Sequence, residues 1–139
     1  MESSTGGEKV KVSGIHERDG YVAAAFEGEF SSSDIEAIFA ACVKATALKG
    51  GTRLLIDFRN LTTEAITTLD RYQLGLFGSR LPKGGRYACL IPPRWTDPQN
   101  FGARVARNRG AVVDVFSSER QALAWLLRPE EPPAPDAEK

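Results

Sequence analysis

The sequence predicts a single α/β domain with a mixed five-stranded sheet and four helices. Apolar strand-like runs alternate with helical patterns, in the order strand, strand, helix, strand, helix, strand, helix, strand, helix. Strands separated by helices are joined by right-handed crossovers and run parallel, so only the N-terminal pair should be antiparallel. Leu54–Ile56 and Phe58 make a nearly continuous apolar run, typical of a strand covered on both faces. We therefore expect the strand at Thr52–Phe58 in the interior of the sheet.

Length and composition agree with one globular domain. The chain has 139 residues, of which 42% are hydrophobic and 26% charged. We place the domain at residues 8–127, between a disordered N-terminus at 1–7 and a flexible tail at 128–139 that is rich in proline and acidic residues. No run of about 18 apolar residues and no signal-peptide pattern occurs, so we expect no membrane span and a cytoplasmic location. Eighteen basic and eighteen acidic residues cancel, which argues against a nucleic-acid partner.

The N-terminal part predicts a hairpin followed by a helix. The runs Lys9–Ile15 and Tyr21–Phe30 have strand-like patterns, and the polar HERDG segment between them has turn chemistry. Ser33 followed three residues later by Glu36 fits a capping box that would begin a helix, and Gly50–Gly51 would end it.

Five more elements are predicted after the central strand. They are a helix at Thr68–Arg80, a strand at Arg86–Ile91, a helix at Pro98–Arg109, a strand at Ala111–Phe116 and a helix that begins at Ser118. Ser118 with Gln121 forms a second capping box, and Gly110 suits the C-terminal cap of the preceding helix.

The helix at Thr68–Arg80 has more apolar surface than one sheet face can cover. Its apolar residues do not fit a single stripe, and Gly75 and Gly78 weaken it by about 1 kcal/mol each relative to alanine. Either part of this surface faces a partner, a ligand or a second subunit, or the helix is packed on two sides within one molecule.

No arrangement typical of catalysis is found. His16, the only histidine, falls in the predicted hairpin turn, so no nucleophile is expected to have a basic partner. Cys42 and Cys89 lie inside apolar patterns without metal-ligand spacing, which favours free buried thiols and no metal site. The glycine pairs in LKGGTR and PKGGRY lack the strand–loop–helix context of a phosphate loop. We therefore predict a protein that is not an enzyme and needs no cofactor.

Charged residues gather near the end of the central strand and after the following helix. Asp57 is expected to bond to loop amides, and Asp70 to complement the helix dipole. The segment 80–109 carries seven basic residues against one acidic residue. Within it, Arg104, Arg107 and Arg109 are candidates for binding an anion, the alternative being a solvated helix with its loops.

Three segments carry a resemblance to a known family. They are RLLIDFRNLT, the helix start TTLDRYQLG, and ARVARNRGAVVDVFSSERQALAWL at 103–126. Together they resemble a STAS-type domain of the SpoIIAA-like group, which is related to bacterial anti-sigma-factor antagonists, over roughly residues 9–127. The resemblance implies a small α/β regulatory or binding module without catalysis of its own, with lipid-carrier-like domains in its wider neighbourhood.

Regulated antagonists of this family carry a phosphoacceptor serine, after an Asp and before Ser-Gly, where the loop after the central strand meets the helix. Counted without gaps, that motif falls on Ala65, Ile66, Thr67 and Thr68, so the preceding carboxylate is replaced by Ala65. Thr67 and Thr68 are the hydroxyls nearest the right place. The alternative is that one of them is the N-cap of the helix.

Two functional hypotheses involve the same predicted surface, formed by the loop after the central strand and the helix that follows it. The first is a protein-binding module whose loop Asn60–Thr68 and helix Leu69–Leu81 dock on a partner or a second copy. The second is a carrier or sensor of a small apolar or acidic, lipid-like ligand, with Arg104 and Arg107 binding an anionic head group. The residues assigned to this surface are Asn60, Thr62, Thr63, Leu69, Tyr72, Leu74, Leu76, Phe77 and Trp95. A flat apolar surface would favour the first hypothesis, and an enclosed cavity the second.

Overall fold

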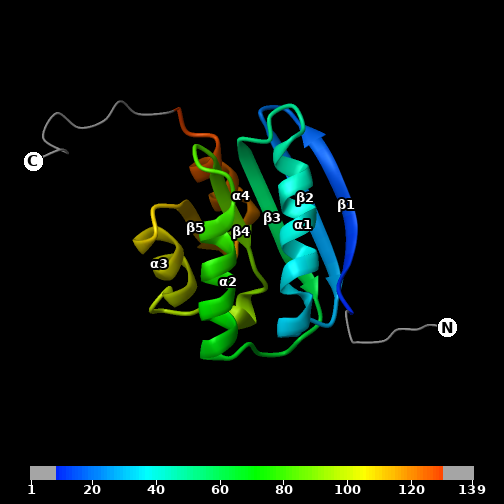
Figure 1. Cartoon of the computed structure of the whole chain (residues 1–139), viewed down its shortest axis with the longest axis vertical. Helices are drawn as coiled ribbons and strands as arrows, with labels where there is room; N and C mark the ends of the chain where they lie inside the picture. The colour runs from blue at the N-terminus through cyan, green and yellow to red at the C-terminus, as the bar shows by residue number, and fades with distance from the viewer. Residues whose placement is uncertain (1–8, 130–139) are drawn as a thin grey trace, which may run out of the picture.

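The computed structural model describes residues 9–129, and within them the predicted order of elements is confirmed (Figure 1). The strands are β1 (Lys11–Arg18), β2 (Tyr21–Gly28), β3 (Arg53–Leu61), β4 (Arg86–Leu90) and β5 (Val112–Phe116). The helices are α1 (Ile35–Thr46), α2 (Thr68–Arg80), α3 (Phe101–Asn108) and α4 (Glu119–Leu126). The segment 1–7, and all but two residues of the predicted tail at 128–139, lie outside the described residues.

The strands lie in the sheet in their order along the chain, β1-β2-β3-β4-β5. Among the described strands, β1 and β2 pair antiparallel and every other neighbouring pair is parallel. The mixed five-stranded sheet predicted from the sequence is therefore confirmed, with β3 at its centre.

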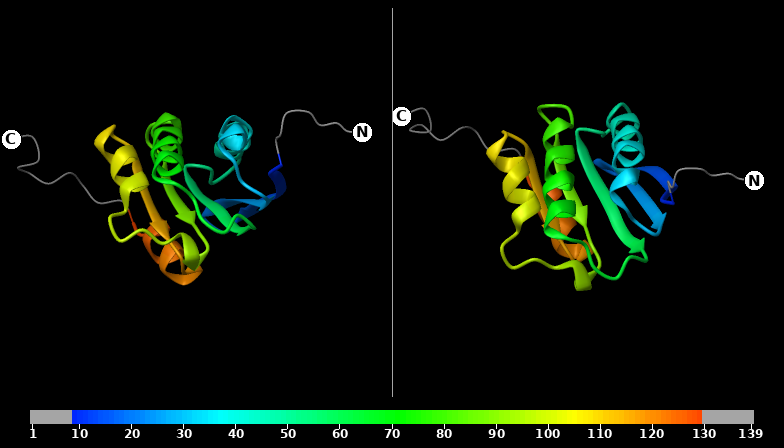
Figure 2. Two further views of the ribbon diagram at one scale, coloured as in Figure 1. Left: turned by 90° about the horizontal axis from the view of Figure 1, so that it is seen from below. Right: turned by 60° about the horizontal axis from the view of Figure 1, so that its bottom comes forward.

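The helices cover both faces of the sheet in unequal numbers. In Figure 2, α1, α2 and α3 lie on one face and α4 on the other. Right-handed crossovers between successive parallel strands leave their helices on the same face. Because α4 follows the last strand it escapes this rule, and its Ala122 and Leu126 are buried against Leu55 and Leu90. β3 is thus covered on both faces, which explains its continuous apolar run.

The hairpin turn is shorter than predicted. β1 continues to Arg18, which pairs with Tyr21, so the turn is Asp19–Gly20. Gly20 has a φ of +89°, a conformation that glycine adopts without the strain a Cβ would cause. His16 therefore lies in β1, opposite Ala23, and not in the turn. The polar HER residues belong to an edge strand, where exposed polar side chains are tolerated.

The capping box before α1 lies two residues earlier than predicted, because Ser31 and Asp34 form it in place of Ser33 and Glu36. A 3-10 turn at Ser32–Asp34 precedes α1, and the buried carboxylate of Asp34 accepts the amide of Ser31 at 2.9 Å. The same carboxylate accepts two amides from the segment before β1, which fixes the start of the helix by a contact distant in sequence. The Glu36 carboxylate instead forms an ion pair with Arg80, with the closest N and O atoms 2.9 Å apart.

Other boundaries differ where backbone bonds tighten or where strand pairing continues. α1 ends at Thr46, ahead of Gly50–Gly51, because its last turn closes with i to i+3 bonds such as Ala47 N to Lys44 O at 3.1 Å. β3 runs three residues past Phe58 because β2 continues to pair with it.

α2 has the predicted bounds and packs closely on α3 through its glycines. A Cβ added at Gly75 would lie 2.5 Å from the carbonyl oxygen of Gly102 and 2.8 Å from the Cβ of Val105. Ordinary contacts of this kind are longer, so the two backbones approach at a distance that only glycine permits. The glycines that weaken α2 as an isolated helix thus form its contact with α3. α2 is therefore packed on two sides within the molecule.

Candidate functional site

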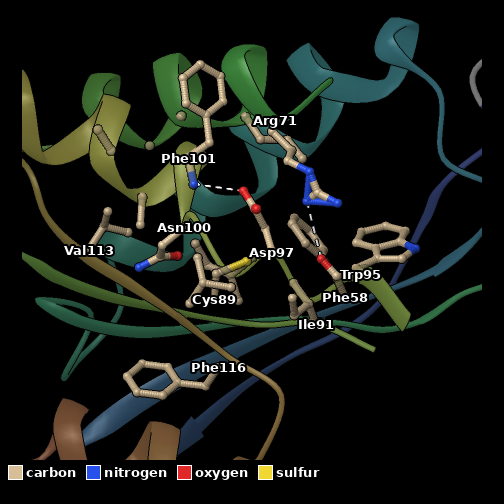
Figure 3. Close-up of a pocket in the computed structure, with 18 of the residues that line it drawn as sticks. Phe58, Arg71, Cys89, Ile91, Trp95, Asp97, Asn100, Phe101, Val113 and Phe116 are labelled. Carbon is tan, nitrogen blue, oxygen red and sulfur yellow. Dashed lines mark hydrogen bonds between the residues drawn. The ribbon is translucent and has the colours of Figure 1, made fainter. Parts of the chain in front are cut away.

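A cavity of about 420 Å³ lies between α2, α3 and the strands β3, β4 and β5, and Gln121 of α4 also lines it (Figure 3). Its wall on the sheet side includes Ile56 and Phe58 of β3, Cys89 of β4 and Val115 of β5, and Phe77 lies in the helical wall. Ligands of open α/β sheets bind in the crevice at the carboxyl ends of the strands. Residues that follow β4, such as Trp95 and Asp97, and Phe116 at the end of β5 line this cavity. The lining is mostly apolar.

The Cys89 thiol shows that the cavity has a weakly polar interior that disfavours charge. Cys89 lies in the middle of the sheet, yet it keeps some accessible surface because its side chain faces the cavity (Figure 3). Burial, with a smaller contribution from the charge of Asp57, raises the pKa of the thiol to about 12. Burial likewise raises the pKa of the Cys42 thiol. Both thiols are therefore neutral at pH 7 and are not activated nucleophiles.

One end of the cavity is polar and adjoins a second, smaller hollow of about 280 Å³. Arg71, Asp97 and Phe101 line both hollows, and Thr68 and Arg104 line the smaller one. This end lies beside the first turn of α2, where unpaired backbone N–H groups leave a partial positive charge.

Asp97 organises this polar end. Its carboxylate accepts the amide of Phe101 at 2.9 Å and that of Gln99 at 3.0 Å. These bonds explain why α3 begins at Phe101 and not at Pro98 as predicted, because they fold residues 97–100 into a turn. The amide of Phe101 is the main cause that lowers the pKa of Asp97, and the charges of Arg71 and Arg104 lower it further. Asp97 is thus a stable anion within electrostatic reach of both guanidinium groups.

Trp95, which the sequence analysis assigned to the binding surface, holds the loop before α2 in place. The indole of Trp95 is buried, forms part of the cavity wall and donates from Nε1 to the Thr63 carbonyl at 2.9 Å. The Thr63 hydroxyl in turn accepts the amide of Phe30 at 2.7 Å. Arg94 also donates to the Thr63 carbonyl, at 3.1 Å. Trp95 and Thr63 therefore fix the loop, whereas Asn60 and Thr62 are exposed.

Thr67 is the N-cap of α2. Its hydroxyl oxygen accepts the amide of Asp70 at 3.0 Å, and the Asp70 carboxylate accepts the amide of Thr67 at 3.0 Å. This capping box satisfies two backbone donors and places the Asp70 charge at the positive end of the helix, as the sequence predicts for Asp70. Thr68 is exposed in the first turn.

The predicted surface residues of α2 divide between two environments. Leu74 and Phe77 line the cavity, and Leu76 is half-buried without lining it. Leu69 is 62% exposed and Tyr72 is 38% exposed, and the Tyr72 ring stacks on Phe101 with 6.5 Å between ring centres. The helix therefore presents one face to the cavity and a second, partly apolar face to the surface.

The basic candidates also divide. Arg104 lines the smaller hollow, and its Nη1 donates to the Gln99 carbonyl at 3.2 Å. Arg107 forms an ion pair with Asp114 instead, and Arg109 is exposed and lines neither hollow. Asp57, expected to bond to loop amides, accepts both the amide and the guanidinium of Arg59.

Sequence reasoning missed Arg71, which lines both hollows. The signal was present in the spacing, because Arg71, Leu74, Gly75 and Gly78 lie at i, i+3, i+4 and i+7 on one helix face. Within residues 9–129, the side chains form no cluster of His, Cys, Asp and Glu that could hold a metal ion. None of the described helices is both long and apolar enough to cross a membrane.

Comparisons with known proteins agree with this fold. A family model described as SpoIIAA-like matches residues 21–127. The structure of an anti-sigma factor antagonist from Mycobacterium paratuberculosis is similar, with 14% sequence identity, a TM-score of 0.62, and coverage of 90% of this chain and 100% of that chain. An uncharacterized DUF3478-family protein with a SpoIIAA-like fold from Shewanella loihica PV-4 has 23% identity, a TM-score of 0.47, and coverage of 90% and 99%. No curated protein gives a significant match.

Proposed function

Because the chain belongs to the SpoIIAA-like family, we propose that it is a non-catalytic binding module, and that its ligand is a small, largely apolar molecule held in the cavity beneath α2 and α3. The volume of about 420 Å³ is the observation that carries this proposal. Ligand pockets range from about 300 to 1,000 Å³, and an apolar cavity of about 150 Å³ is enough to bind benzene. An apolar molecule of moderate size would replace poorly hydrogen-bonded water in this space.

The chemistry of the lining supports binding without catalysis. Cys89 is the thiol that faces the cavity, and its raised pKa keeps it protonated. His16, the only histidine of the chain, lies on β1, an edge strand three strands away from β4. A nucleophile needs a nearby base to be activated at neutral pH, and here the two side chains are held apart by the sheet.

Filling the cavity tests the proposal. Val115 and Val112 lie on the same strand, but Val115 lines the cavity whereas Val112 is 50% exposed and does not. We expect Val115→Phe to abolish or strongly weaken binding of a neutral apolar probe such as decanol, measured by calorimetry, and Val112→Phe to leave it unchanged. Absence of decanol binding to the unmodified protein would overturn the proposal.

A second candidate function is protein interaction, favoured by the exposed face of α2. Leu69 and Tyr72 lie on this face, and Asn60 near the end of β3 and Thr62 in the loop that follows are exposed as well. The Mycobacterium protein of similar fold is an anti-sigma factor antagonist, and a regulatory role of that kind would use such a surface. Phosphorylation of Thr67 would compete with its capping bond to Asp70, whereas Thr68 is exposed and has no such role.

Self-association is the form of this function that can be tested directly. If the exposed face of α2 binds a second copy, the chain sediments as a dimer and Leu69→Glu converts it to a folded monomer, because a buried unpaired charge disfavours the interface. A chain that remains monomeric at high concentration would exclude the second copy as the partner.

A further inference from the structure

We propose that the ligand is an anionic amphipath, with one apolar body and one carboxylate or phosphate head group, and that Arg71 and Arg104 bind the head group. This rests on the proposed function, because the apolar body must occupy the cavity. Arg71, Asp97 and Phe101 line both the main cavity and the smaller hollow, so a molecule whose apolar body fills the cavity can have its polar end beside Arg71.

Charge is confined to one end of this combined space. Among the described residues that line the main cavity, Arg71 and Asp97 are the only charged ones, and both also line the smaller hollow. Much of the remaining wall is made by uncharged residues such as Phe77, Cys89 and Val113. A charged group is strongly disfavoured against such a wall unless it is paired. A bound molecule can therefore place a charge only at the end near the first turn of α2.

The two guanidinium groups at this end have donors to spare. Arg71 reaches from α2 toward Trp95, to whose carbonyl its Nη1 donates at 3.3 Å (Figure 3). Arg104 donates one bond, to the Gln99 carbonyl at 3.2 Å. A guanidinium carries five N–H donors. Within residues 9–129 neither of these two forms an ion pair, whereas Arg59, Arg80, Arg94 and Arg107 each do. Carboxylate and phosphate groups fit such forked donors.

Asp97 is the one carboxylate among the described residues that line the two hollows, and it opposes an anion. Its carboxylate already accepts the amides of Gln99 and Phe101, so part of its charge is balanced by the backbone. Asp70 already offsets the positive end of α2, so two guanidinium groups remain against the one lining carboxylate, and the net charge favours an anion. The alternative is a ligand with a cationic head group that pairs with Asp97, and the test distinguishes it by tighter binding of a cationic probe.

The test compares four probes with the same apolar chain, namely decanoate, decyl phosphate, decanol and decylammonium, in calorimetric titrations of the full chain. We expect decanoate or decyl phosphate to bind at least about tenfold more tightly than decanol, because a hydrogen-bonded charge pair is stronger than a neutral one. Whichever of the two anions binds more tightly identifies a carboxylate or a phosphate head group. Arg71→Gln and Arg104→Gln should each weaken the preferred anion about tenfold relative to decanol, and Arg109→Gln should change the binding of neither probe.

The outcomes separate this inference from the proposed function. Equal binding of decanol and both anions would overturn the anionic head group and leave the cavity as the binding site. Tighter binding of decylammonium would place a cation on Asp97 and also overturn it. If even decanol fails to bind, the proposed function fails. Arg71→Gln removes a bond to the Trp95 carbonyl, and the variant could fail to fold for that reason. In that case Arg104→Gln tests the head-group site, because Arg104 is exposed and its replacement leaves the core intact.

Discussion

Replacing Gly75 or Gly78 by alanine should change stability in opposite directions, although both glycines lie in α2 and face α3. An added Cβ at Gly75 would lie 2.5 Å from the carbonyl oxygen of Gly102 and 2.8 Å from the Cβ of Val105. An added Cβ at Gly78 would meet the Cβ of Ala106 at 3.5 Å, which is an ordinary contact.

The magnitudes follow from two opposing effects. Alanine stabilises a helix interior by about 1 kcal/mol relative to glycine, and at Gly78 nothing opposes this gain. At Gly75 the overlap can be relieved only by moving α3 away from α2, and overpacking of this kind costs about 1–3 kcal/mol. Gly78→Ala should therefore be up to about 1 kcal/mol more stable than the unmodified protein, and Gly75→Ala about 0–2 kcal/mol less stable.

Urea denaturation followed by circular dichroism measures both variants under the same conditions. The slope of unfolding free energy against denaturant should stay the same, so that the midpoints report stability directly. If Gly75→Ala were as stable as Gly78→Ala, or more stable than the unmodified protein, the close contact between α2 and α3 would be refuted.

Three further predictions concern the cap, the two faces of α2 and the buried thiol. Thr67→Ala should lower the free energy of unfolding by about 1 kcal/mol through loss of the N-cap, and Thr68→Ala by less than about 0.5 kcal/mol, as measured by denaturation. Phe77→Glu should unfold the protein because the ring is buried, whereas Leu69→Glu should keep the native circular dichroism spectrum; a folded Phe77→Glu variant would contradict the packing of α2. The raised pKa of Cys89 lets the folded state keep a proton that the unfolded thiol loses above about pH 8.5. The free energy of unfolding, measured relative to that of Cys89→Ala, should therefore fall as the pH rises from 8 to 10. A difference between the two proteins that does not change with pH would refute the raised pKa.

The sequence by itself determined the order and pairing of the elements. β3 is central because its apolar run is continuous, and α2 has the predicted bounds because its start and end are marked by local signals, the cap at Thr67 and the Leu81–Pro82 stop. Parallel pairing follows from strands separated by helices. These features depend on residues close together in the chain, so a sequence pattern contains them.

The tertiary structure decided everything that depends on residues distant in the chain. The start of α1 departs from its capping signal because the Asp34 carboxylate accepts amides of the segment before β1, 24 and 25 residues away. Gly75 weakens a helix when seen alone, yet it is required by a backbone that approaches from α3. The cavity is lined by residues of three strands and of α2, α3 and α4, and Arg71 and Arg104 line one hollow only because α2 and α3 pack side by side. Free volume and charge proximity are properties of packed surfaces, and no local pattern in the sequence specifies them.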